Sequence, residues 1–322
     1  MSENLDYITV YGDSYSDIHP ATRKTNGPVW SQQLAKSWSA QLVSKAVPGA
    51  TFCQNNKING SWLQKQVHED ITLNDKDKST VQIIFLGITD LIETKGQATS
   101  DIKQWIQCIE DQVKFLYSVN PNSRIILMGV PALEFSPYAM THKSSTTNLK
   151  QNIIEFNVAL EEQILDWRAE LSDQIEFFDT YLVFSDILGD PSVLNMDNVD
   201  DAYWDKCQGQ CTDAVDSYLW WDSVHVTGTG HKAISNTIQS KEFFNLQASL
   251  SESEQATTLE KGMTGLPQQY IRCLSWFILG AIIAMIFYMF RHNRVIISLK
   301  KKLQTKAAKI YSPRNTHEYT LV

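Results

Sequence analysis

Short apolar runs alternate with longer amphipathic segments over more than half of this chain of 322 residues. Five runs have the length and composition of buried strands: Ile8–Tyr11, Leu42–Ala46, Val81–Leu86, Arg124–Val130 and Ile175–Phe178. Three segments between them repeat apolar residues at the helical spacing of three and four: Pro28–Trp38, Asp101–Val119 and Asn148–Leu171. This alternation predicts an α/β fold, a three-layer α/β/α sandwich around a parallel, flavodoxin-like sheet of about five strands.

Two of the predicted strands run directly into polar residues. The motif Gly12-Asp13-Ser14 follows the first strand, and Gly87-Ile88-Thr89-Asp90 follows the third. Because open parallel sheets bind ligands at the carboxyl ends of their strands, we expect both segments to border the functional site. A serine at this place can form a turn, cap a helix or act as a nucleophile.

A second polar group lies in the stretch "YLWWDSVHVTGTGHKAI", which holds an aspartate and a histidine three positions apart. Acyl transfer by serine needs a general base within hydrogen-bond reach of the hydroxyl, an acid that orients this base, and donors for the oxyanion. One turn can place the carboxylate of Asp222 against the imidazole of His225 and leave the second ring nitrogen for Ser14. The nucleophile is therefore the interpretation that the sequence favours for Ser14.

Together these motifs resemble those of the GDSL, or SGNH, serine hydrolase family, in the style of its fungal and plant members. The first block is matched by "YGDSYSD", in which Tyr15 takes the place of leucine, and the second by "SKAVPGATF", which contains Gly49. The third block, usually Gly-x-Asn-Asp, is matched by "LGITDLI", and the fifth by "WWDSVH". The resemblance covers roughly residues 5 to 245, with the blocks in the family's order.

By this resemblance Ser14 is the nucleophile, His225 the general base and Asp222 the acid that orients the base. The backbone N–H groups of Ser14 and Gly49 are the implied oxyanion donors, the first of them at a strand-to-helix turn that points N–H groups toward developing negative charge. Thr89 stands where the family has asparagine, and its hydroxyl is a shorter and single donor. Losing one oxyanion donor costs about a hundred- to a thousand-fold in turnover, so we expect an active but slow enzyme.

Two functions are compatible with these residues. The first is a membrane-anchored serine esterase or lipase that hydrolyses acyl or acetyl esters of a lipid, a sugar or a small alcohol through an acyl-enzyme, with no cofactor and no metal ion. The second is a catalytically weakened pseudo-hydrolase that acts as a binding or scaffold protein at a membrane. Thr89 motivates the second, whereas the complete set of Ser14, Asp222 and His225 favours the first. The net charge of −8 and the absence of a basic footprint in the main body give no reason to expect a nucleic-acid partner.

The five cysteines are too few and too scattered for a disulfide scaffold: Cys53, Cys108, Cys207, Cys211 and Cys273. Cys207 and Cys211 have no second pair or nearby histidine with which to bind zinc. These two form a local disulfide if the region lies in an oxidising compartment, and stay free thiols in the cytosol.

The 18 residues from Cys273 to Phe290, "CLSWFILGAIIAMIFYMF", carry no charge and lie between two arginines. This length and these flanks predict one transmembrane helix. The chain then divides into a hydrolase domain (1–248), a polar linker (249–270), the membrane helix (271–290) and a basic tail (291–322).

Two rules conflict over the side of the membrane that the hydrolase domain faces. The basic tail predicts a cytosolic carboxyl terminus and hence a luminal domain. The residues before the first strand contain no secretory signal, which favours a domain made in the cytosol and anchored late. We expect a single-pass membrane protein whose hydrolase domain faces the cytosol on an internal membrane. The sequon at Asn59 can carry a sugar only in the alternative, luminal orientation.

Overall fold

The computed structural model describes residues 5–55, 60–69, 78–142, 146–171, 174–208 and 210–246. The chain separates into two units, Met1–Leu250 and Ser251–Val322, and all described residues belong to the first. The expected linker, membrane helix and basic tail, from residue 249 onward, lie outside the described residues, as does Asn59. Among the described helices, none is long and apolar enough to cross a bilayer.

The core of the first unit is a parallel sheet of five strands in the order β2-β1-β3-β4-β5. The strands are β1 (Tyr7–Gly12), β2 (Gln41–Ser44), β3 (Thr80–Phe85), β4 (Arg124–Met128) and β5 (Ile175–Phe178). The central strand β3 is buried along its whole length, as expected for a sheet that helices cover on both faces. The predicted parallel sheet of five strands is confirmed, and each strand lies within two residues of its predicted bounds.

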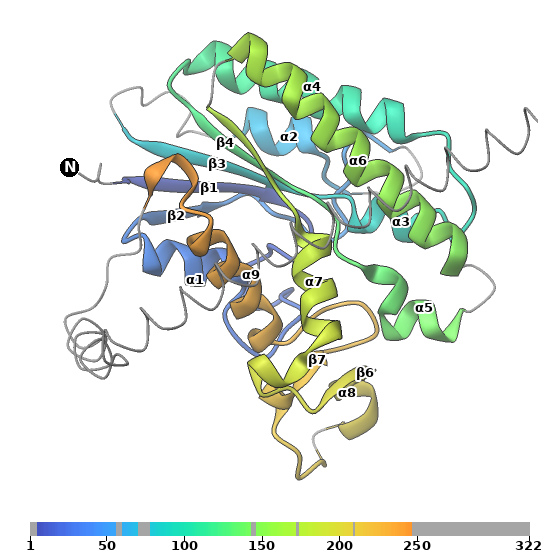
Figure 1. Ribbon diagram of the computed structural model, residues 1–322. Helices are drawn as coiled ribbons and strands as arrows, with labels where there is room; N and C mark the ends of the chain where they lie inside the picture. Colours follow the sequence, from blue (N-terminus) through green and yellow to red (C-terminus); the bar gives the residue numbers. More distant parts are fainter. Residues whose placement is uncertain are drawn as a thin grey trace, which may run out of the picture. The chain divides into compact units, whose positions relative to one another are not determined.

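Nine α-helices lie within the described ranges: α1 (Trp30–Ser37), α2 (Leu63–His68), α3 (Ile88–Glu93), α4 (Ile102–Val119), α5 (Pro137–Thr141), α6 (Thr146–Leu171), α7 (Thr180–Gly189), α8 (Tyr203–Cys207) and α9 (Gly228–Ser240). Figure 1 shows α2, α4 and α6 on one face of the sheet and α1 and α9, which pack against each other, on the opposite face. The three-layer arrangement is therefore confirmed, and the three predicted helices correspond to α1, α4 and α6.

Several short elements of the structure were not predicted. They include a second, two-stranded parallel sheet of β6 (Asn198–Ala202) and β7 (Tyr218–Trp220). They also include four 3₁₀ helices: Leu133–Phe135, Pro191–Leu194, Val215–Ser217 and Phe243–Asn245. The sequence of β6, "NVDDA", is partly exposed and polar, so it lacks the apolar run by which the main strands are recognised.

Two buried side-chain amides fix the chain where it leaves the sheet. Gln66 on α2 donates from Nε2 to the carbonyl of Gly12 at 2.9 Å and accepts from the Gly12 N–H at 2.8 Å. In the same way, Asn157 on α6 donates from Nδ2 to the carbonyl of Val130 at 2.9 Å and accepts at Oδ1 from the Val130 N–H at 2.8 Å. Because buried backbone polar groups need partners, these amides hold the ends of β1 and β4 against the helices of one layer.

Candidate active site

Ser14 lies in a tight turn immediately after β1. The N–H of Ser16 donates to the carbonyl of Asp13 at 3.1 Å, and the N–H of Tyr15 donates to Oδ1 of Asp13 at 3.0 Å. The next helix along the chain is α1, which begins at Trp30. The expectation of a strand-to-helix turn at Ser14 is therefore wrong, and so is the interpretation of this serine as a helix cap. An aspartate that binds the following N–H groups makes a self-contained turn, which needs no helix behind it.

Asp222 and His225 form a second turn, after β7. Oδ1 of Asp222 accepts hydrogen bonds from the N–H groups of Val224 at 2.9 Å and of His225 at 2.8 Å. The imidazole Nδ1 of His225 lies 2.8 Å from both carboxylate oxygens of Asp222, and its Nε2 lies 2.8 Å from Oγ of Ser14. The structure thus places the three side chains in one hydrogen-bonded row. This geometry fits an imidazole that donates from Nδ1 to the carboxylate and accepts at Nε2 from the serine hydroxyl.

Asp222 keeps its negative charge at neutral pH. Burial acts to raise the pKa of this carboxyl, but the hydrogen bond and charge of His225, together with the N–H groups of Val224 and His225, outweigh burial and lower the pKa below its ordinary value. A fixed carboxylate next to an imidazole stabilises the imidazolium that forms when the base takes a proton.

Gly49 and Ser14 both offer unused N–H groups. Within the part of the chain that the structure describes, neither N–H has a hydrogen-bond partner. Gly49 has a φ of +78°, a left-handed conformation that favours glycine, and a Cβ added there would meet no atom within 4 Å. The N–H of Val47 donates to the carbonyl of Gly12 at 3.0 Å, which brings the Gly49 segment beside the Ser14 turn.

Thr89 lies in the first turn of α3 and is half-buried. Its N–H is one of the groups that stabilise the charged form of Asp13, so the start of α3 also borders the Ser14 turn. Among the described residues, no hydrogen bond occupies the Thr89 hydroxyl. All five residues that the sequence analysis named therefore lie on the carboxyl edge of the sheet or on the turn that contacts it.

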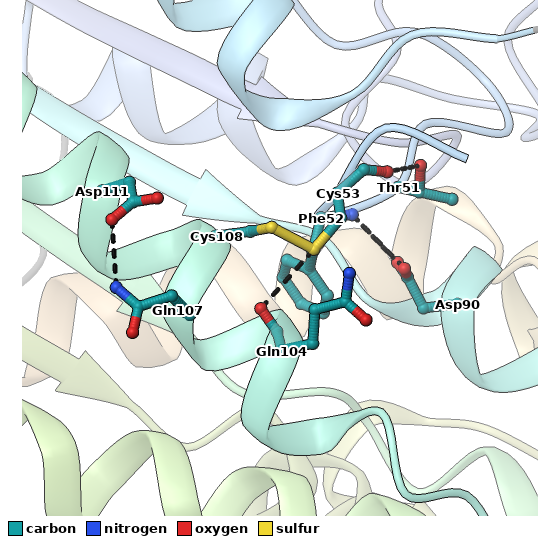
Figure 2. The surroundings of a disulfide bond; sticks show 8 residues. All are labelled: Thr51, Phe52, Cys53, Asp90, Gln104, Gln107, Cys108 and Asp111. Carbon is teal, nitrogen blue, oxygen red and sulfur yellow. Dashed lines mark hydrogen bonds between the residues drawn. A yellow bond between two sulfur atoms is a disulfide. The ribbon is translucent and has the colours of Figure 1, made fainter. Parts of the chain in front are cut away.

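Phe52 and Cys53, which lie three and four residues after Gly49, are held from two sides (Figure 2). The N–H of Phe52 donates to Oδ1 and Oδ2 of Asp90, each at 3.3 Å, and Cys53 forms a disulfide with Cys108 on α4. This disulfide was not predicted, because its cysteines are separated by 55 positions and no local spacing links them. The second disulfide joins Cys207 to Cys211, which is one of the two states left open above.

Asp13, Asp90 and His231 are buried titratable groups at this edge of the sheet. Burial raises the pKa of Asp13 to about 6 against the opposing effects of nearby N–H groups and of His225. Burial, reinforced by the charge of Asp13, raises the pKa of Asp90 to about 8, while the N–H of Phe52 acts to lower it. Burial also lowers the pKa of His231 on α9 to about 3, so this imidazole is neutral. At pH 7 Asp13 is therefore mostly ionised, whereas Asp90 is mostly protonated and His231 is neutral.

A family model for the GDSL-like lipase/acylhydrolase family matches residues 8–238, and the chain belongs to this family of ester-bond hydrolases. The chain is 20% identical over 231 residues to the thermolabile hemolysin of Vibrio parahaemolyticus, with 66% of this chain and 54% of the hemolysin covered. It is 23% identical over 243 residues to the phosphatidylcholine-sterol acyltransferase of Aeromonas hydrophila, with 66% of this chain and 67% of the acyltransferase covered. The chain thus spans about half the length of the first relative and two thirds of the second.

Solved structures of low sequence identity are also similar. A catalytic mutant of an acetylxylan esterase from Geobacillus stearothermophilus has a TM-score of 0.49 at 14% identity, with 78% of this chain and all (100%) of the esterase covered. A lipase from a goat rumen metagenome has a TM-score of 0.48 at 14% identity, with 74% and 98% covered.

The raised pKa of Asp90 predicts how stability depends on pH. The folded protein binds the Asp90 proton more tightly than the unfolded chain does. Its contribution to the free energy of unfolding is therefore fully present below the unfolded pKa of 3.8 and is lost as pH rises through about 8. We expect Asp90→Asn to gain stability relative to the wild type between pH 4 and pH 8, measured from urea unfolding midpoints at each pH.

The matched control is Asp111→Asn, which removes an exposed carboxylate from α4 that accepts a hydrogen bond from Gln107. This variant removes one carboxylate from the surface and leaves Asp90 in place, so it shows how far the loss of any carboxylate changes the unfolding midpoints. Parallel profiles for Asp90→Asn and the wild type would show instead that Asp90 does not hold a proton in the folded state.

Proposed function

We propose that this protein is a serine esterase or lipase that hydrolyses acyl or acetyl esters through an acyl-enzyme. The observation that carries the proposal is the bonded row in which Oγ of Ser14 lies 2.8 Å from Nε2 of His225 and Nδ1 lies 2.8 Å from the carboxylate of Asp222. Membership of the GDSL-like lipase/acylhydrolase family supports the same chemistry.

The proposed acylation step begins as His225 Nε2 takes the proton of the Ser14 hydroxyl. The serine oxygen bonds to the ester carbonyl carbon, and the carbonyl oxygen becomes an oxyanion that the free N–H groups of Ser14 and Gly49 stabilise. The imidazolium, stabilised by Asp222, then gives its proton to the alcohol oxygen as the carbon–oxygen bond breaks. Water repeats the sequence on the acyl-enzyme, which releases the acid and returns the proton to Ser14.

The second candidate is the weakened pseudo-hydrolase, and Thr89 is the single observation in its favour. A threonine hydroxyl is one donor on a short side chain, whereas an asparagine amide reaches further. The hydrogen bonds of His225 to both Ser14 and Asp222 favour the enzyme, because an intact triad retains catalysis even when the oxyanion hole is weakened.

The proposed substrates are esters of a lipid, an acylated sugar or a small alcohol. One curated relative is named for acyl transfer from phosphatidylcholine to a sterol, so lipid esters come first in a screen of substrates. Acetylated sugars and short p-nitrophenyl esters complete the set, and the ratio of their kcat/KM values identifies the acyl and alcohol groups that the site accepts.

We further propose a single-pass membrane protein with the domain boundaries expected from the sequence: 1–248, 249–270, 271–290 and 291–322. The two disulfides bear on its orientation, because disulfides persist in oxidising compartments and are rare in the cytosol. Together with the basic tail they favour a hydrolase domain in the lumen or outside the cell over the cytosol-facing domain that we expected from the sequence alone.

Ser14→Ala should abolish both labelling by a fluorophosphonate probe and ester hydrolysis, because it removes the attacking oxygen. Removing a triad member typically costs about 10⁴–10⁶ in kcat. The control Ser118→Ala removes an exposed hydroxyl that bonds only to its own helix, and should leave labelling and kcat unchanged. Wild-type protein that neither labels nor hydrolyses any ester in the screen would refute the proposal.

Substitutions at Thr89 separate the two candidate functions. If the threonine hydroxyl supports the oxyanion, Thr89→Val lowers kcat by about a hundred-fold or more at an unchanged KM, and Thr89→Asn retains or raises kcat. If ester hydrolysis appears only in Thr89→Asn and not in the wild type, the natural protein is a pseudo-hydrolase.

Glycosylation at Asn59 tests the orientation. A luminal domain should carry a sugar at the sequon, giving a mobility shift that a glycosidase removes and that is absent from Asn59→Gln. A full-length protein without this shift, whose cysteines react as free thiols in the intact membrane fraction, has its hydrolase domain in the cytosol.

A further inference from the structure

Tyr15, the residue after Ser14, reaches across the site to the Asp222–His225 turn. Its side chain is buried, with 1% of its surface exposed. Its hydroxyl donates to the carbonyl oxygen of Val224 at 2.6 Å, across a sequence separation of 209 residues. Val224 lies between Asp222 and His225, so this bond connects the turn that carries Ser14 with the turn that carries the acid and the base.

Tyr15 differs from the other hydrogen-bond donors to the turn 223–225 because it donates from its side chain. Of the other carbonyls in this turn, that of Ser223 accepts from the N–H of Tyr138 at 2.8 Å and that of His225 accepts from the N–H of Trp221 at 2.7 Å. Both of these donors are backbone groups. Tyr15, by contrast, donates to the carbonyl of Val224 from its side chain, and it comes from the segment that holds Ser14.

The ring of Tyr15 is fixed by packing. Its centroid lies 5.9 Å from that of Phe85 and 6.0 Å from that of His231, both edge to face, and 5.8 Å from that of His225. The GDSL family has leucine at this position. A leucine side chain would fill part of this space but has no hydroxyl that could reach the Val224 carbonyl. Burial, together with the charges of Asp222 and Asp13, raises the pKa of Tyr15 well above its ordinary value, so the hydroxyl keeps its proton.

We propose that Tyr15 is a positioning residue for the proposed esterase: its hydroxyl holds the Asp222–His225 turn at the distance at which His225 Nε2 meets the Ser14 hydroxyl. The expected effect of Tyr15 on kcat rests on the proposed function. The expected effect on the position of the turn rests only on the hydrogen bond to Val224. Without the hydroxyl the Val224 carbonyl is left without a donor, and the turn is free to move away from the nucleophile.

The kinetic test compares Tyr15→Phe and Tyr15→Leu with the control Tyr11→Phe. Tyr11 is also fully buried, and its hydroxyl donates to Oε1 of Gln82 at 3.0 Å, so the control removes the same atom from the core without touching the proposed site. We expect both Tyr15 variants to lose about tenfold in kcat at an unchanged KM, because the misplaced base affects the transition state and not substrate binding. Tyr11→Phe should keep the wild-type kcat.

A double-mutant cycle shows whether Tyr15 acts through His225. In a His225→Ala background, Tyr15→Phe should cause no further loss of the residual activity, because the base that it positions is absent. A Tyr15 that merely stabilised the fold would give the same proportional loss in both backgrounds. That result, or an unchanged kcat in Tyr15→Phe, would overturn the inference.

Backbone hydrogen exchange of the peptide spanning 221–226 provides a readout that needs no activity. We expect exchange about tenfold faster in Tyr15→Phe than in the wild type, and unchanged in Tyr11→Phe, because the Val224 bond restrains this turn. If the wild type is inactive but shows this exchange pattern, the proposed function is rejected, while the restraint of the Asp222–His225 turn by Tyr15 is supported. Exchange that is equal in all three proteins would reject the connection itself.

Discussion

The hydrogen bond between Ser14 Oγ and His225 Nε2 joins segments 211 residues apart, and the fold must bring both ends of the hydrolase domain to one place for this bond to form. The parallel sheet does so by ending β1 beside the Gly49 and Thr89 segments. The turn that holds Asp222 and His225 directly precedes α9. Because α9 packs against α1, this turn lies close to the end of β1. The N–H of Gly228, at the start of α9, donates to Oδ1 of Asn26 at 2.8 Å, and a Cβ on Gly27 would lie 3.2 Å from the Cα of Gly228. This close approach places the start of α9, and the His225 turn just before it, beside the segment that follows Ser14.

Desolvation determines which groups at this edge are charged. Asp13, Asp90 and His231 are all buried, and burial shifts the pKa of each toward its neutral form. Asp222 is the exception, because His225 and two backbone N–H groups offset its burial. At neutral pH Asp90 is therefore mostly protonated and His231 neutral, whereas Asp13, with a pKa of about 6, is mostly ionised. Of the two ionised carboxylates, Asp222 is the one that is hydrogen-bonded to the imidazole of His225.

The sequence predicted the parts of the structure that carry a strong local pattern. The five main strands lie on short segments rich in apolar residues, and α1, α4 and α6 repeat apolar residues at helical spacing, so both kinds of element were predicted. The polar strand β6, the short helices and the Cys53–Cys108 disulfide depend on tertiary contacts that leave no local pattern. The motifs and their order in the chain predicted Ser14, Asp222 and His225 as site residues. The structure places these three side chains together, and their catalytic roles stay a prediction. The tyrosine at position 15 was visible as a departure from the family, but its contact with Val224 spans the whole domain and needed the fold.

A crystal structure of the protein after reaction with a fluorophosphonate would show the nucleophile and the oxyanion donors at once, because the phosphonyl group imitates the tetrahedral intermediate. We expect a covalent bond from phosphorus to Ser14 Oγ, with the phosphonyl oxygen about 2.7–3.1 Å from the N–H groups of Ser14 and Gly49, and with His225 still hydrogen-bonded to Asp222. A phosphonyl group on another residue, or an oxygen directed away from both N–H groups, would contradict this expectation.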